Sequence, residues 1–157
     1  MLKIDMKKIS PSLRSIFEEF QNIPKGILID SPDELIATGL VISDPAQDIL
    51  SEAKARIFFT RRSLKHIAEK VDGKRLFAIT PLILCDYDTV HLSSRKNRFL
   101  FSRWVLADTN IKPHIVTIEV VNPGKAIIIT IFVAKEKYLK NFEILWRTAY
   151  PPSAYPL

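Results

Sequence analysis

The chain has 157 residues, of which 47% are hydrophobic and 25% are charged. This is the size and composition of one globular domain with its own core, and it excludes a linker-like or low-complexity protein. The net charge of +6 favours a polyanionic partner. A single cysteine, Cys85, excludes an intrachain disulfide and a cysteine-rich zinc site.

The first part of the chain carries helix signals separated by turn residues. A Ser-Pro pair at residues 10–11 supplies an N-cap and a first helical position, which predicts a helix as far as Ile23. Asp44 is the cap of a second predicted helix. Between them, the apolar pieces at residues 26–30 and 39–43 leave open a choice between short strands and extended loop.

A third helix is predicted over the run RRSLKHIAEKV, with Thr60 as its expected N-cap after a short β-like run. Apolar residues recur in it at positions i, i+3, i+4 and i+7, which is the spacing of one helix face. The predicted buried stripe is formed by Leu64, Ile67, Ala68 and Val71. His66 lies about 160° from the centre of that stripe, at roughly 100° per residue, so it is expected to point away from the core. A turn and a short helix with Pro81 near its start should follow.

The periodicity changes after residue 96, where β-branched and aromatic runs alternate with turn-like segments. Four strands are predicted, at residues 97–106, 114–121, 125–134 and 141–150. Helices followed by such a meander indicate an α+β fold, with N-terminal helices packed on a four-stranded antiparallel sheet. We expect a single domain over residues 1–157, with a helical extension at 1–55 and a core at 56–153.

The predicted sheet has one face free of helices, and its polar side chains make that face a candidate site. Glu119 stands in a strongly apolar strand, so it must be paired, exposed on the open face, or functional. A cross-strand ion pair with Arg103 or Arg147 is the structural alternative. The polar residues carried by these strands are Arg98, Arg103, Glu119, Arg147, Thr148 and Tyr150.

A helix that displays Lys65 and His66 beside such a sheet suits metal-independent RNA cleavage. That reaction needs a base for the 2′-OH proton, an acid for the leaving 5′-oxygen, and cations for the phosphorane. Histidine can be the acid or the base near neutral pH, and arginine binds phosphate oxygens through two bonds. The basic turn at residues 93–98 is a further candidate contact to the RNA backbone.

The order of three motifs resembles the barnase–EndoU–colicin–RelE-like nucleases, particularly their phage-associated branch. The motifs are "IFFTRRSLKHIAEK", "LFAITPLILCDYDTV" and "ILWRTAYPPS", and the resemblance covers about residues 57–153. It implies a barnase/RelE-like fold with His66 as the catalytic histidine and Lys65 as a phosphate contact. It also implies Arg147 and Thr148 as last-strand site residues, with Tyr150 stacking on a base or closing the site.

The chain departs from the family pattern at two places. Lys70 stands where the family often has a second histidine, and "CDYD" at residues 85–88 replaces a proline.

The sequence therefore predicts a toxin-like, metal-independent endoribonuclease that needs no cofactor. His66, Arg147, Thr148 and Glu119 are its expected catalytic residues, and Lys65, Arg98, Arg103 and Tyr150 its expected substrate contacts. RNA and an acidic inhibitor or antitoxin are the expected partners. Two alternatives remain open: a non-catalytic RNA-binding module that uses the same basic sheet, and a protein-interaction domain. In either alternative, His66 is an ordinary solvated helix residue.

The expected location is the cytoplasm. The charged N-terminal segment lacks the apolar stretch of a signal peptide. The longest apolar runs are about half of the roughly 20 residues that a membrane-spanning helix needs. A soluble protein that does not enter the membrane is predicted.

Overall fold

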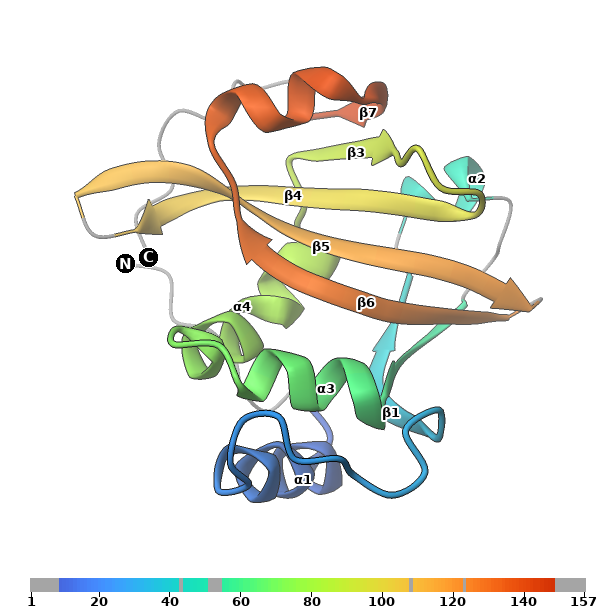
Figure 1. Cartoon of the computed structure of the whole chain (residues 1–157). Helices are drawn as coiled ribbons and strands as arrows, with labels where there is room; N and C mark the ends of the chain where they lie inside the picture. The colour runs from blue at the N-terminus through green and yellow to red at the C-terminus, as the bar shows by residue number, and fades with distance from the viewer. Residues whose placement is uncertain (1–8, 43, 51–54, 108, 123, 149–157) are drawn as a thin grey trace.

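The computed structural model is an α+β fold built on one seven-stranded sheet (Figure 1). The residues that it describes are 9–42, 44–50, 55–107, 109–122 and 124–148. The helices are α1 (Pro11–Gln21), α2 (Ala46–Ile49), α3 (Arg61–Ala68), α4 (Gly73–Cys85) and the 3₁₀ helix η2 (Glu136–Asn141). The strands are β1 (Leu35–Val41), β2 (Arg56–Thr60), β3 (Thr89–Leu92), β4 (Arg98–Ala107), β5 (Asn110–Asn122), β6 (Lys125–Val133) and β7 (Glu143–Arg147).

The sheet is larger than predicted and is mixed, with the strand order β1-β2-β6-β5-β4-β3-β7. The prediction of a four-stranded antiparallel sheet is wrong in strand number and in strand direction: the sheet has seven strands, and β2 pairs with β6 in parallel. This pairing occupies the free edge of β6, so the last strand has no place beside it. The chain instead passes through η2 and adds β7 to the far edge, antiparallel to β3.

Strands β4, β5 and β6 lie where the sequence predicts them, and they form an antiparallel meander. The turn between β5 and β6 contains Gly124 at φ +81°, a left-handed conformation that glycine adopts without the steric cost of a Cβ. Strand β3 was not predicted. It has only four residues, and its apolar positions are too few to establish a period of two.

Three helices differ from their predicted extents. α3 ends at Ala68, and Val71 is fully exposed rather than part of the buried stripe. α4 runs to Cys85, so Pro81 lies well inside it rather than near its start. α2 ends at Ile49, whereas the second helix was expected to extend to residue 56; residues 51–54 of it lie outside the described residues, and Arg56 belongs to β2.

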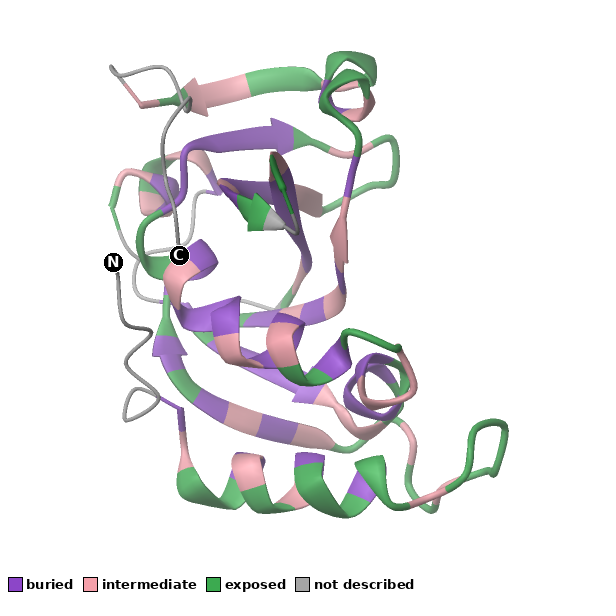
Figure 2. Ribbon diagram, turned by 90° about the vertical axis from the view of Figure 1, so that its left-hand side faces the viewer, coloured by how far each residue is buried: buried purple, intermediate pink, exposed green. Residues whose placement is uncertain are grey.

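Described residues before position 56, among them Phe17 and Phe20 of α1, share the core of the later part of the chain. Phe17 on α1 stacks on Phe77 of α4 with ring centroids 4.0 Å apart, and Phe59 on β2 lies 6.2 Å from the same ring. Buried residues gather between α1, α3, α4 and one face of the sheet (Figure 2). Burial of these apolar side chains, at about 25 cal/mol per Å² of apolar area, is what holds the two parts together.

The other face of the sheet carries a smaller apolar cluster beneath η2. Leu139 of η2 is buried with Leu100 of β4 and Ile115 of β5. The face that was expected to be open is therefore partly covered. Helices α3 and α4 lie on one side of the central strands and η2 on the other (Figure 1).

Candidate functional site

Helix α3 holds His66 at the surface, as its periodicity predicts. The hydroxyl of Thr60 accepts a hydrogen bond from the Ser63 N–H at 3.0 Å, and the Ser63 hydroxyl accepts one from the Thr60 N–H at 3.1 Å. This reciprocal capping box satisfies N–H groups at the helix start. Leu64 and Ile67 are fully buried, which turns His66 toward solvent.

The loop after α1 packs against α3 and binds two charged side chains that lie one helical turn apart, Lys65 and Glu69. Lys65 is buried, donates to the Pro24 carbonyl at 3.3 Å and lies 3.4 Å from Glu69. The Gly26 N–H donates to the other oxygen of Glu69 at 3.0 Å. That hydrogen bond is the main reason the pKa of Glu69 is lowered, and Lys65 adds to it. Lys65 was expected to contact phosphate, but here its ammonium binds groups of this chain.

His66, Lys65 and Glu69 line a cavity of about 420 Å³ between α3 and this loop, which we call the α3 pocket. Arg62 is at its rim and forms an exposed ion pair with Asp33 at 3.1 Å. Its other lining residues are Gly26, Ile27, Leu28, Ile29 and Pro32. Both cations of the pocket therefore already have a carboxylate beside them. His66 supplies the imidazole of the pocket, and histidine is a side chain that can act as acid or base near neutral pH.

The structure does not bring the predicted catalytic residues into one cleft. α3 packs on β2 and β6, whereas Arg147 ends β7 at the other edge of the sheet. Four strand spacings of about 4.8 Å each separate β6 from β7. Arg147 is also paired in register with Thr89, on the face opposite the helices. Thr148 donates its N–H to the Asp88 carbonyl at 2.8 Å, and Tyr150 lies outside the described residues.

Glu119 pairs with Arg98, its direct neighbour on β4, over 2.9 Å. The sequence expectation of an ion pair across strands is met, with a different arginine from the two proposed. Arg103, expected to contact substrate, is almost completely buried on the helix side of the sheet. Its guanidinium donates to the carboxylate and the carbonyl of Asp86, both at 2.6 Å. The Arg103 guanidinium is therefore too buried to contact RNA.

A buried polar cluster beside Arg147 was missed by the sequence analysis. Thr89 bonds to Nδ1 of His91 at 3.2 Å and makes a short hydrogen bond to the Ser102 hydroxyl. Burial lowers the pKa of His91. The alternation of Thr89 and His91 shows that they share a face, but the strand pairing that adds Ser102 was not predicted. All three side chains are buried, so their hydrogen bonds link the neighbouring strands β3 and β4.

A concentration of positive charge lies where α4 and β5 begin and β6 ends. Arg75 on α4 donates to Nε2 of His114 at 2.7 Å, and Nδ1 of that histidine donates to the Lys112 carbonyl at 3.0 Å. The Ala134 N–H binds the Pro113 carbonyl at 2.9 Å, which holds the chain just before Lys135 against β5. We call Arg75, Lys112, Lys135 and Lys137 the basic corner. The carboxylates of the described residues that belong to these segments are Asp72, 3.7 Å from Arg75, and Glu136.

The comparisons with known proteins add no relative. No family model, no curated protein and no solved structure matches this chain. Among the residues that the structure describes, no helix is long and apolar enough to cross a membrane. Within the same residues, no three His, Cys, Asp or Glu side chains are grouped so that they could hold a metal ion.

Proposed function

We propose that this protein binds RNA and that the basic corner is its principal contact with the phosphate backbone. The observation that carries the proposal is that hydrogen bonds hold together the three segments that bear Arg75, Lys112 and Lys135: Arg75 and the Lys112 carbonyl both bind His114, and the Ala134 N–H binds the Pro113 carbonyl. Lys135 and Lys137 are exposed, and Arg75 and Lys112 are half-buried. Lysine and arginine that neutralise phosphates release counterions, which supplies most of the affinity for a polyanion.

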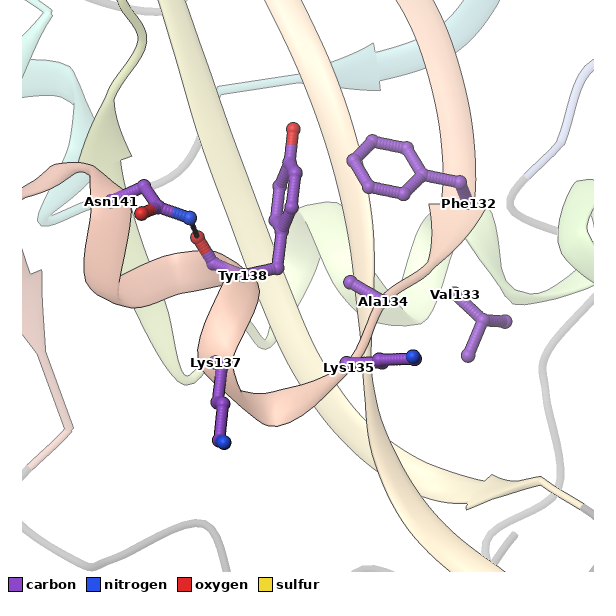
Figure 3. A pocket seen from close by; sticks show the side chains of 7 residues that line it. All are labelled: Phe132, Val133, Ala134, Lys135, Lys137, Tyr138 and Asn141. Carbon is purple, nitrogen blue, oxygen red and sulfur yellow. Dashed lines mark hydrogen bonds between the residues drawn. The ribbon is translucent and has the colours of Figure 1, made fainter.

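The α3 pocket is a weaker candidate for the phosphate backbone. Lys65 is held by Glu69 and by the Pro24 carbonyl, and Arg62 is paired with Asp33. A phosphate would have to displace carboxylates of the protein from both cations. At the basic corner, the two lysines that precede and follow Glu136 are both exposed and project from the start of η2 in different directions (Figure 3).

The test is the salt dependence of RNA affinity. Lys135→Ala combined with Lys137→Ala should weaken binding and reduce the slope of log K against log salt by about 1.4, or 0.7 per lost contact on a single strand. Arg95→Ala combined with Lys96→Ala is the matched control, because it removes the same charge from the exposed β3–β4 turn. That turn lies at the other end of β4, and only a small change is expected there.

Two results would overturn the proposal. One is the absence of wild-type binding to RNA at about 50 mM salt, where such contacts are strong. The other is a larger loss of slope in the Arg95/Lys96 variant than in the Lys135/Lys137 variant, which would place the RNA surface at the opposite end of the sheet.

A second candidate function is metal-independent RNA cleavage with His66 as general acid or base. It is favoured by the exposed imidazole in the α3 pocket, close enough to Glu69 for their charges to interact. Wild-type protein should then cut RNA in EDTA and leave 2′,3′-cyclic phosphate ends. His66→Ala should lower the rate by on the order of 10²–10⁴ and leave RNA affinity nearly unchanged. Equal cleavage by both proteins, or none by the wild type, would refute this role of His66.

A further inference from the structure

Beside the basic corner, and sharing Lys135 and Lys137 with it, lies a groove between the end of β6 and η2 (Figure 3). Its volume is about 420 Å³, within the range of small-molecule sites. Phe132 of β6 and Tyr138 of η2 form its aromatic part, with ring centroids 5.3 Å apart and nearly perpendicular planes. Both rings are half-buried, so each keeps some surface open to solvent.

The fully buried part of the contact between η2 and the sheet consists of other residues, and the two rings pack at its edge. Leu139, Leu100 and Ile115 are buried together beneath the helix and supply that contact. Tyr138 packs at the margin of this cluster, where it also meets Phe142 at 5.2 Å. Because Tyr138 keeps part of its ring exposed at this margin, the ring is available to stack on a planar ligand.

The polar groups of the groove define the chemistry of that ligand. Lys135 and Lys137 carry positive charge on the side away from the Tyr138 hydroxyl (Figure 3). Asn141 donates its Nδ2 to the Tyr138 carbonyl at 3.0 Å, which fixes its amide at the rim. Aromatic faces, two cations and an oriented amide together match a nucleobase with its neighbouring phosphates.

We propose that this groove holds an unstacked nucleobase of single-stranded RNA, with the base against Tyr138 and Phe132 and the adjoining phosphates on Lys135 and Lys137. The inference rests on the proposed RNA binding and makes it selective for strand type. A duplex keeps its bases stacked inside the helix, so it can contact the lysines but it presents no base to the rings.

The experiment compares the affinity of full-length protein for a single-stranded RNA octamer and for duplex RNA by fluorescence anisotropy. Tyr138→Leu keeps an apolar side chain and removes the ring, so it should weaken octamer binding about tenfold and duplex binding little. Tyr138→Phe, which restores the ring, should recover most of the octamer affinity. Phe99→Leu is the matched control, since it removes a half-buried ring on the opposite, helix-covered face of the sheet.

A readout on the wild-type protein does not depend on how the variants fold. Ultraviolet cross-linking to an octamer that contains 4-thiouridine should yield an adduct on Tyr138 or Phe132. Adducts only elsewhere, or octamer binding by folded Tyr138→Leu equal to that of the wild type, would overturn the nucleobase site. If the lysine variants still lose salt-dependent affinity, the proposed function survives that result. No RNA binding by the wild type would end both.

Discussion

Arg75 donates a hydrogen bond to Nε2 of His114 over 2.7 Å and so joins α4 to β5. An arginine can only donate, so this contact requires His114 to be neutral, with its proton on Nδ1 toward the Lys112 carbonyl. His114 is completely buried, and loss of hydration is the main reason its pKa falls to about 4. The neighbouring charges of Arg75 and Lys112 lower the pKa further, while the Lys112 carbonyl and Asp72 raise it.

The first prediction is a loss of stability in mild acid. Because the pKa of His114 is about 4 when folded and about 6.5 when unfolded, protonation favours the unfolded chain. The contribution is present above pH 6.5 and is lost as the pH falls toward 4, by roughly 3 kcal/mol in all. Urea unfolding at pH 7, 5.5 and 4.5 measures it. His114→Gln should flatten the dependence, and an unchanged dependence in that variant would contradict the assignment.

The second prediction concerns Arg103, which sequence analysis assigned to the substrate. Arg103→Ala removes the hydrogen bonds to Asp86 and leaves a space beneath the sheet. It should reduce the free energy of unfolding by on the order of 2 kcal/mol. RNA affinity at a temperature where the variant is folded should not change. A specific loss of RNA affinity with full stability would show that the guanidinium reaches the ligand.

The third prediction separates the structural role of Glu119 from a catalytic one. Glu119 and Arg98 are partly buried cross-strand neighbours, so a double-mutant cycle with Glu119→Gln and Arg98→Gln should give a coupling of about 0.5–1 kcal/mol. Neither change should alter any RNA cleavage rate. A rate loss of 100-fold or more in folded Glu119→Gln would instead make this carboxylate a catalytic group.

The fourth prediction concerns the turn that joins α3 to α4. A Cβ added at Gly73 would stand 2.1 Å from the carbonyl oxygen of Ile67, so the backbone would have to move. Gly73→Ala should lower stability by about 3 kcal/mol, as overpacking does. Gly26→Ala is the control: its Cβ meets open space, and only the left-handed backbone at φ +84° costs about 1 kcal/mol. Thermal unfolding that ranks them the other way would contradict this geometry.

Local signals in the sequence predicted the elements whose reasons are local. The Ser-Pro start of α1, the periodicity of α3 with His66 outward, and the β5–β6 turn at Gly124 each depend on a few adjacent residues. The α+β class followed from the order of these signals. The start of β4 and the extents of β5 and β6 were predicted to within a few residues.

Tertiary structure alone decided where the candidate site residues lie. The sequence predicted that Glu119 could pair with an arginine across strands, but only strand register determined that its partner is Arg98 rather than Arg103 or Arg147. The parallel pairing of β2 with β6 occupies the edge of β6, and β7 pairs instead with β3 at the far end of the sheet, which carries Arg147 away from His66. Which strand edge is free depends on every other pairing in the sheet. A pattern of neighbouring residues carries no information about that choice.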